Sequence, residues 1–248
     1  MNKIMIVTGA SRGIGAATAV LAAQRGYAVC VNYVRNRDAA EDVVRKIEAI
    51  GRHAIAVPAD IAIEAEVMRL FATVDDKLGR VTALVNNAGV LEKQTTIAGI
   101  DSARLGRVFA TNVTGAFICS REAVRRMSTR QGGEGGGIVN VSSRASQIGS
   151  AGEYIDYAAS KGAVDSLTIG LAKEVAEEGI RVNGVRPGFI YTEMHASGGE
   201  PNRVDRVKAF APMKRGGTAE EVASAILWLL SEESAYVTGT FIDVSGGR

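Results

Sequence analysis

The regular alternation of short apolar runs with longer helical patterns constrains the fold of this 248-residue chain more than any other feature. Such alternation is typical of parallel sheets, and right-handed crossovers place the helices on both faces. We therefore expect an α/β fold, a single-domain Rossmann-type doubly wound parallel sheet of seven strands. Strands are expected at residues 3–8, 28–33, 53–58, 83–86, 137–141, 181–186 and 239–244. Helices are expected at residues 13–26, 37–50, 64–78, 102–127, 156–178 and 219–230.

The chain shows no internal repeat and no linker that would divide it, so residues 1–248 are expected to form one dinucleotide-binding and catalytic domain. One connection, residues 188–212, is long for a compact domain and contains Gly198, Gly199 and Pro201. It follows the carboxyl end of a strand, where ligands bind in open α/β sheets. This position favours a substrate lid over a plain surface excursion.

Charge and composition remove several classes of function. The chain has 29 Lys and Arg against 27 Asp and Glu, so its balance gives no reason to propose nucleic acid or an anionic membrane as partner. No apolar stretch is long enough to span a bilayer, and no signal-peptide pattern precedes the first strand. Cys30 and Cys119 form no disulfide framework, and no Cys/His cluster has metal-ligand spacing. We expect a cytoplasmic protein with no metal site.

A glycine-rich turn at the end of the first expected strand gives the main cofactor signal. Gly9 permits a tight turn, Gly13 lets the backbone approach a pyrophosphate, and Gly15 lets the helix pack closely on the strand. The helix that follows offers N–H donors and a positive dipole to phosphates. The spacing G-x-x-x-G-x-G differs from the usual G-x-G-x-x-G fingerprint, and three glycines can also be purely structural. The expected cofactor contacts in this turn are Gly9, Ser11, Arg12, Gly13, Ile14 and Gly15.

Other candidates for cofactor contacts lie near the carboxyl ends of the later strands. Asp60 could accept a hydrogen bond from an adenine amino group, or it could cap the next helix. Small and amide side chains after the fourth strand leave room for a cofactor, and a Pro-Gly turn closes the sixth strand. These candidates are Tyr33, Arg35, Asp60, Ile61, Asn87, Ala88, Gly89, Pro187, Gly188, Ile190 and Thr192.

The end of the second expected strand predicts which nicotinamide cofactor is preferred. NAD enzymes usually place an acid there to bind the ribose 2′-hydroxyl, whereas this chain has no acid until Asp38. Arg12, with Arg35 or Arg37, could pair with a 2′-phosphate, although these arginines could equally be solvated surface charges. We therefore expect NADP(H) to be preferred, with NAD(H) possible.

Tyr157 and Lys161 form the motif Y-x-x-x-K on an expected helix. Residues four apart share a helix face, so the phenol and the ammonium point into the same space. A phenol is a poor acid or base near neutral pH, but a neighbouring ammonium favours the phenolate and lowers its pKa. The motif alone is weak, because a Tyr and a Lys fall four apart often by chance. It predicts general acid–base work by Tyr157.

These motifs occur in order along the chain, each at a strand's carboxyl end or on the adjoining helix. In this arrangement the sequence resembles the short-chain dehydrogenase/reductase family. The motifs that carry the resemblance are the glycine turn, Asn86-Asn87-Ala88-Gly89, a serine after the fifth strand, Y-x-x-x-K and Pro-Gly. The resemblance covers nearly the whole chain, in the family's single-domain branch. It is strongest to bacterial glucose-dehydrogenase-like and 3-oxoacyl-carrier-protein-reductase-like members.

The resemblance implies four catalytic residues: Asn112, Ser143, Tyr157 and Lys161. Ser143 would orient the substrate oxygen, Tyr157 would exchange the proton, and Lys161 would hold the nicotinamide ribose and lower the Tyr157 pKa. Asn112 would position a water that links Lys161 to solvent. Ser143 lies fourteen residues before Tyr157, one more than in the family's acyl-carrier-protein reductases. The resemblance also implies a homotetramer, or at least a dimer, built on helices 102–127 and 156–178.

The sequence therefore predicts an NADP(H)-preferring oxidoreductase that acts on a carbonyl or alcohol carbon of a small substrate, such as a sugar, polyol or other carbonyl compound. A 3-oxoacyl thioester reductase is the alternative within enzymes. A non-catalytic dinucleotide-binding regulator is the alternative of another class, since a fold alone does not establish a function. A regulator would not need the proton-transfer groups Ser143, Tyr157 and Lys161, and neither would a methyltransferase.

Overall fold

Seven parallel strands form one sheet at the centre of a computed structural model, which describes residues 3–248. The strand order is β3-β2-β1-β4-β5-β6-β7, so the order reverses between β1 and β4. This confirms the predicted doubly wound sheet, and the reversal creates the crevice in which such folds bind ligands. The strands are β1 (Ile4–Val7), β2 (Ala28–Tyr33), β3 (Ala54–Pro58), β4 (Ala83–Asn86), β5 (Gly136–Val141), β6 (Ile180–Pro187) and β7 (Phe241–Val244).

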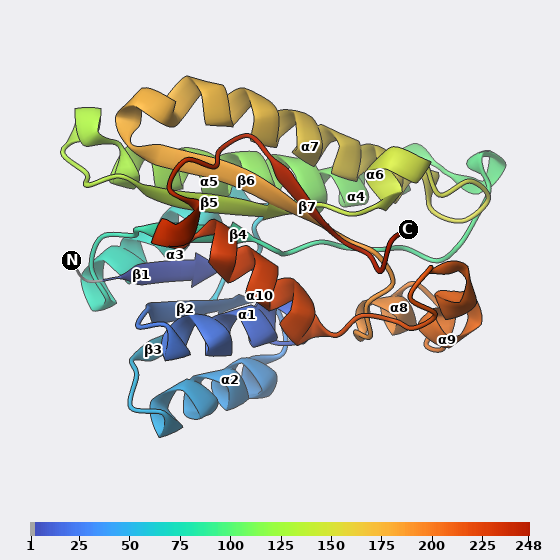
Figure 1. The fold of residues 1–248 in the computed structure, drawn as a ribbon, viewed down its shortest axis with the longest axis horizontal. Helices are drawn as coiled ribbons and strands as arrows, with labels where there is room; N and C mark the ends of the chain where they lie inside the picture. The colour runs from blue at the N-terminus through green and yellow to red at the C-terminus, as the bar shows by residue number, and fades with distance from the viewer. Residues whose placement is uncertain (1–2) are drawn as a thin grey trace.

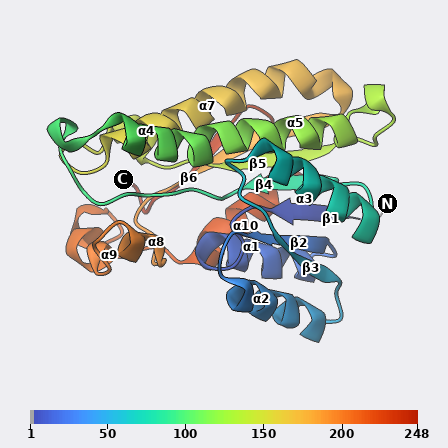
Figure 2. The same cartoon turned by 180° about the vertical axis from the view of Figure 1, so that it is seen from behind.

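Helices cover both faces of the sheet, which gives three layers (Figures 1 and 2). One face packs against α1 (Gly13–Gln24), α2 (Arg37–Ala49) and α10 (Ala219–Leu229). The other face packs against α3 (Glu64–Lys77), α5 (Gly115–Met127) and α7 (Ile155–Val175), with α4 (Ser102–Phe109) beside α7. The shorter helical elements are η1 (Ile97–Gly99), η2 (Ala110–Thr114), η3 (Thr129–Gln131), α6 (Ala145–Ile148), η4 (Ala176–Glu178), α8 (Met194–Ser197), α9 (Arg203–Val207), η5 (Lys208–Phe210) and η6 (Glu232–Ser234).

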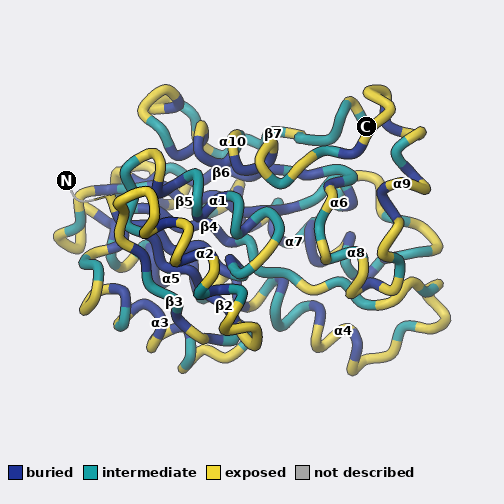
Figure 3. The backbone as a smooth tube through the Cα atoms, turned by 90° about the horizontal axis from the view of Figure 1, so that it is seen from below, coloured by how far each residue is buried: buried dark blue, intermediate teal, exposed yellow. Residues whose placement is uncertain are grey.

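Local sequence explains where these elements begin. All four residues of β1 are apolar and buried, as expected for a parallel strand covered on both faces. The side chains of Asn36 and Asp101 cap α2 and α4, and Thr218 with Glu221 forms a capping box at the start of α10. The strands fill the buried interior, while much of the connection after β6 is exposed (Figure 3).

The expected helix over residues 102–127 is wrong in its middle. The chain forms α4, then a π-helical turn η2 over Ala110–Thr114, then α5. A π turn holds an extra residue and commonly occurs at functional sites. Here it contains Asn112, whose side chain is almost completely buried. The 3.6-residue apolar period continues across the turn, so the sequence pattern gave no sign of the bulge.

The predicted lid, residues 188–212, is more ordered in structure than a long loop. It contains α8, α9 and η5 and lies beyond the carboxyl end of β6 (Figure 1). Backbone hydrogen bonds join its first residues to Gly217, a few residues beyond its end: Tyr191 N–H donates to the Gly217 carbonyl at 3.0 Å, and Gly217 N–H donates to the Phe189 carbonyl at 2.8 Å. The segment is therefore a small helical cap on a closed base.

Candidate active site

The glycine turn between β1 and α1 adopts backbone conformations that favour glycine. Gly9 has φ +62° and Gly13 has φ +53°. A Cβ on Gly15 would lie 2.5 Å from Nδ2 of Asn87 and 2.6 Å from the carbonyl oxygen of Gly9. Any side chain at Gly15 would therefore push α1 away from the sheet.

The start of α1 presents backbone N–H groups that need acceptors. Arg12 is the N-cap residue and makes no side-chain capping bond, and the first turn holds no acidic residue. Among residues 3–248, no acceptor is found for the N–H groups of Gly13, Ile14 and Gly15. Unpaired N–H groups and a positive helix end fit the pyrophosphate of a dinucleotide. A Cβ on Gly13 would come within 3.3 Å of Thr192, so the absent side chain leaves this space open.

Two buried polar side chains that the sequence analysis overlooked hold the turn in place. The Asn32 carboxamide accepts a hydrogen bond from Gly9 N–H at 3.1 Å and donates one to the Ala59 carbonyl at 3.0 Å. The Thr8 hydroxyl accepts from the N–H groups of Asn87 and Ala88, both at 3.0 Å. The signal was a polar residue inside each apolar strand run, where it must be hydrogen-bonded to be buried.

The candidates for the adenosine end are Arg12 in the glycine turn and residues at or just after the ends of β2 and β3. Tyr33 is buried, whereas Arg12 and Arg35 are exposed. Arg12 donates to the Ser197 hydroxyl of the lid at 3.5 Å, and neither arginine forms an ion pair with any residue from 3 to 248. Asp60 accepts a hydrogen bond from Ala62 N–H at 2.9 Å, but the N-cap of α3 is Ile63. The capping alternative for Asp60 is therefore wrong.

Ser143, Tyr157 and Lys161 meet in one cavity of about 390 Å³ at the carboxyl ends of β5 and β6. Ser143 follows β5, and its hydroxyl accepts a hydrogen bond from Ala145 N–H at 3.1 Å. Tyr157 and Lys161 lie on the same face of α7, with the ammonium 5.6 Å from the phenol ring centroid. Lys161 Nζ also donates to the Val141 carbonyl at 2.7 Å. The i, i+4 spacing therefore places both groups in the same space, as expected.

The cavity also brings together several of the predicted cofactor contacts. Those on its lining are Ile14, Asn87, Pro187, Gly188, Ile190 and Thr192. The remaining candidates are not part of that lining: Gly9, Ser11, Arg12, Gly13, Gly15, Tyr33, Arg35, Asp60, Ile61, Ala88, Gly89 and Asn112. His195 of the lid also lines the cavity, and its Nε2 lies 2.9 Å from the Ile190 carbonyl oxygen.

The expected lowering of the Tyr157 pKa is wrong for the protein without cofactor. Burial raises the pKa of Tyr157 to about 12, and a hydrogen bond with Ser143 offsets only part of this effect. Burial likewise lowers the pKa of Lys161 to about 8, opposed by the charge of Asp165. Loss of water around both groups outweighs their mutual interaction. At neutral pH the phenol therefore keeps its proton and can act as an acid.

Asn112 is held rigidly next to this pair. Its Oδ1 accepts from Val90 N–H at 2.7 Å, and its Nδ2 donates to the Val90 carbonyl at 3.1 Å and to the Ser160 hydroxyl at 3.0 Å. A Cβ on Gly89 would lie 3.4 Å from Asn112 Oδ1 and 3.5 Å from Lys161 Nζ. Gly89 thus leaves open the space between the amide oxygen and the ammonium.

A buried ion pair beside Tyr157 is a second feature that the sequence analysis missed. Arg104 of α4 donates to Asp156 of α7 with two nitrogens, at 2.6 and 3.2 Å, and a third nitrogen donates to the Lys93 carbonyl at 2.6 Å. The side chains of Arg104 and Asp156 are 9% and 1% exposed, so the pair is almost completely shielded from solvent. It fixes the first turn of α7, and thereby Tyr157, against α4. Helix and strand periodicities relate residues only a few positions apart, so the sequence pattern could not predict a pair separated by 52 positions.

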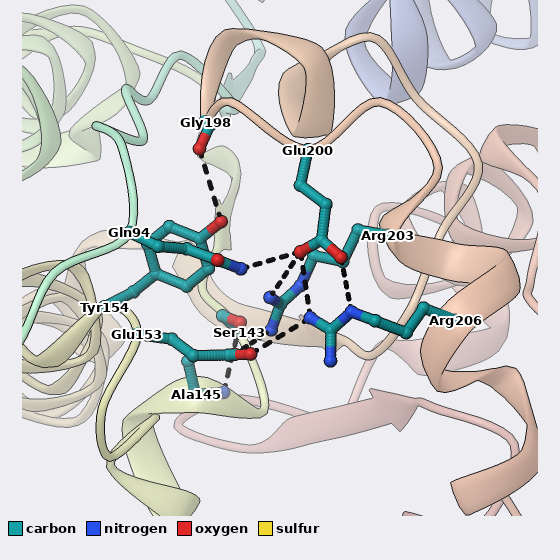
Figure 4. Close-up of polar contacts among 9 residues, drawn as sticks. All are labelled: Gln94, Ser143, Ala145, Glu153, Tyr154, Gly198, Glu200, Arg203 and Arg206. Atoms are coloured by element: carbon teal, nitrogen blue, oxygen red, sulfur yellow. Dashed lines mark hydrogen bonds and ion pairs between the residues drawn. The ribbon is translucent and has the colours of Figure 1, made fainter.

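Charged side chains join the lid to the body of the protein (Figure 4). Arg203 and Arg206 of α9 pair with Glu153, which precedes α7, and with Glu200 of the lid. Gln94, from the connection after β4, donates to Glu200 at 2.6 Å, and the Arg203 guanidinium lies 4.8 Å from the ring centroid of Tyr154. We call Glu153, Glu200, Arg203 and Arg206 the lid cluster.

Between residues 3 and 248, no helix combines the length and hydropathy needed to cross a membrane. In the same part of the chain, no group of three or more His, Cys, Asp or Glu side chains is arranged to hold a metal ion. Cys30 and Cys119 are both buried and free, as expected for small apolar residues.

Comparison with known proteins identifies relatives over nearly the full length. A family model described as enoyl-(acyl carrier protein) reductase matches residues 9–248. An uncharacterized oxidoreductase of Escherichia coli K12, YgfF, is 60% identical over 245 residues, which is 99% of each chain. A 3-oxoacyl-[acyl-carrier-protein] reductase of Synechocystis is 40% identical over 246 residues, covering 99% of this chain and 96% of the relative.

A solved structure has the same fold. The crystal structure of a short chain dehydrogenase from Burkholderia cenocepacia, in complex with NADP, superposes with a TM-score of 0.91. It is 32% identical in sequence, and the match covers 99% of this chain and 97% of that one.

Proposed function

This chain belongs to the short-chain dehydrogenase/reductase family, and from that premise we propose that it is an NADP(H)-preferring oxidoreductase for a small carbonyl or alcohol substrate. Membership makes it an NAD(P)-dependent dehydrogenase/reductase that acts on a CH–OH or C=O group. The proposal rests mainly on one observation, that Ser143, Tyr157 and Lys161 share the wall of one cavity. We propose a sugar, polyol or other small carbonyl compound as substrate. A 3-oxoacyl thioester reductase is the alternative, favoured by the name of the Synechocystis relative.

The experiment that tests this function is a panel of sugars, polyols, simple ketones and one acyl thioester. Each is incubated with oxidised or reduced nicotinamide cofactor, and the change in nicotinamide absorbance is followed. We expect turnover of at least one small hydroxy or carbonyl compound with NADP(H). Turnover confined to the acyl thioester would instead support the alternative.

When bound, the nicotinamide supplies or accepts the hydride, so the residues of this chain have to orient the substrate and move the proton. We assign to Ser143 the orientation of the substrate oxygen by a hydrogen bond. Tyr157 gives that oxygen its proton in reduction and removes it in oxidation. Lys161, held by the Val141 carbonyl, is assigned to the nicotinamide ribose. Because its pKa is raised to about 12, Tyr157 is protonated at neutral pH, which is the form that reduction requires.

Proton supply to this site is assigned to the space between Asn112 and Lys161. A carboxamide oxygen has two lone pairs, and Asn112 Oδ1 uses one for Val90 N–H. We propose that a water on the other lone pair links Lys161 to solvent. Gly89 supports this proposal, since a methyl group there would lie 3.4 Å from Asn112 Oδ1 and 3.5 Å from Lys161 Nζ.

We propose that residues 1–248 act as one domain and that the lid, residues 188–212, orders further when ligands bind. The lid lines the cavity through Thr192, Met194 and His195, so a bound ligand would add contacts to it. Backbone amides of α8 and α9 are expected to exchange hydrogen more slowly once NADPH and a substrate are added. The control is α10, whose amides are expected to exchange equally slowly in both states. Equal protection of the lid with and without ligands would contradict the proposal.

We propose a homotetramer, or at least a dimer, built through α4, α5 and α7. Apolar side chains remain exposed on these three helices, with Leu105 40%, Phe117 49% and Ile169 42% exposed. Light scattering at micromolar concentration is expected to give a mass of two or four chains. Phe117→Glu would place a charge on this surface and is expected to shift the mass toward one chain, whereas Tyr236→Glu, on a fully exposed residue, is expected not to do so. A monomeric wild type would refute the proposal.

A further inference from the structure

Three of the four residues of the lid cluster lie on a wall of the cavity that has no part in the proton transfer assigned above. Glu153, Tyr154, Arg203 and Arg206 line the same cavity as Ser143 and Tyr157. They come from two segments, the turn before α7 and the lid, which Figure 4 shows facing each other. A substrate whose reacting carbon lies at Tyr157 would extend its remaining atoms toward this wall.

The charges of the lid cluster balance. Two guanidinium groups meet two carboxylates, and Arg206 holds the pKa of Glu200 down at about 2. Hydrogen bonds from Arg203 and Arg206 likewise lower the pKa of Glu153, against the opposite effect of its burial. A carboxylate or phosphate of a substrate would lie next to these two acids and compete with them for the same guanidinium groups. The wall therefore suits a part of the substrate that carries no charge.

Hydrogen-bonding capacity remains in the cluster after these pairs are made. Arg206 donates from Nε and Nη2, while its Nη1 has no partner in the chain from residue 3 to residue 248 (Figure 4). Each Glu153 oxygen accepts one bond, from Arg203 or Arg206, and a carboxylate oxygen can accept another. A free donor thus lies beside free acceptor positions. This arrangement matches neighbouring hydroxyl groups, each of which both donates and accepts.

An acyl chain would use none of this capacity. Apolar atoms placed on the cluster would remove water from its charged groups and return no hydrogen bond, which is unfavourable. Hydroxyl groups would replace the lost water contacts one for one. The apolar lining nearby, including Leu91, Met194 and Val207, would still contact the carbon skeleton.

We propose that Arg206 and Glu153 are specificity residues that bind hydroxyl groups of an uncharged polyhydroxylated substrate, a sugar or polyol, distal to its reacting carbon. This inference rests on the proposed function and selects one substrate class within it. It assigns the lid cluster a role in recognition in addition to closing the lid on the body of the protein.

The test compares Arg206→Ala and Glu153→Gln with the wild type, using NADP(H), the probes D-glucose and ribitol, and acetoacetyl-coenzyme A as the acyl thioester. We expect KM for the hydroxylated probe that is turned over to rise about tenfold in each variant, the loss of roughly one charge-assisted hydrogen bond. We expect kcat to stay within about threefold, because Tyr157 is untouched. Activity with acetoacetyl-coenzyme A is expected not to fall. Arg130→Ala is the matched control, since Arg130 pairs with Glu177 and Glu178 outside the cavity lining.

Several outcomes would overturn the inference. If KM for the hydroxylated probes is unchanged in both variants, even with a lower melting temperature, the lid cluster only holds the lid on the body of the protein and does not bind substrate. A wild type that binds neither probe in its NADP(H) complex, judged by melting temperature and calorimetry, would also reject it. If that wild type turned over acetoacetyl-coenzyme A alone, the inference would fail, but the protein would still be an oxidoreductase. No turnover of any carbonyl or alcohol would instead count against the proposed function itself.

Discussion

Replacing Tyr157 with phenylalanine is expected to lower kcat by about 10²- to 10⁴-fold, the usual contribution of a general acid or base. The change removes one oxygen from a side chain that lies on the cavity wall with Ser143 and Lys161. The ring remains, so α7 and the cavity keep their shape. NADPH affinity is therefore expected to stay within about twofold of the wild type. Steady-state kinetics and a fluorescence titration of NADPH measure the two effects.

The matched control is Tyr236→Phe, which removes a phenol oxygen from a fully exposed residue and is expected to leave kcat unchanged.

The pH profile gives an independent readout. Lys161, with its pKa lowered to about 8, is mostly charged below pH 8 and mostly neutral above it. Reduction, which needs the protonated phenol and the charged lysine, is expected to slow as pH rises through about 8. Oxidation needs the phenolate and is expected to speed up as pH rises. A variant within a few-fold of wild-type turnover, or a flat profile, would contradict the assignment of Tyr157.

Wild-type protein is expected to bind NADPH about ten- to a hundredfold more tightly than NADH, because one charge-assisted hydrogen bond contributes about 1.5–3 kcal/mol. β2 ends at Tyr33 without an acid, so nothing there repels a 2′-phosphate. The Asn32 side chain at this end is bonded to Gly9 and to the Ala59 carbonyl, so it stabilises the glycine turn. Arg35, just after β2, and Arg12, in the glycine turn, are exposed and form no ion pair with residues 3–248. Arg12 makes one long hydrogen bond, to the Ser197 hydroxyl at 3.5 Å, so both guanidinium groups keep donors for a phosphate.

The measurement is a titration of both reduced cofactors with the wild type, Arg12→Ala and Arg35→Ala. At least one of the two variants is expected to lose NADPH affinity selectively while its NADH affinity stays nearly constant. Arg45→Ala is the matched control, because Arg45 is also exposed but pairs with Asp42 on the outer side of α2. Tighter NADH binding by the wild type would show that the missing acid does not set the preference. An equal loss for both cofactors would show that the arginines act only on the shared part of the dinucleotide.

Local patterns in the sequence predicted most of the framework. The seven strands lie close to where the short apolar runs placed them, since a strand covered on both faces is mostly apolar. The glycine turn could be predicted too, because only glycine tolerates the backbone of Gly9 and the close packing at Gly15. The spacing of Tyr157 and Lys161 fixed their common helix face, which follows from helix geometry alone.

Tertiary structure alone decided the features that depend on distant residues and on burial. The pKa of Tyr157 is raised to about 12, because the loss of water around the phenol is a property of the assembled cavity and outweighs a neighbour four residues away. The π turn at Asn112 places its amide between Val90 and Ser160, and no local period encodes that contact. The pair Arg104–Asp156 and the lid cluster join residues about 50 positions apart. Sequence patterns report neighbours along a helix or strand, whereas ion pairs across the fold form only after the sheet has brought its loops together.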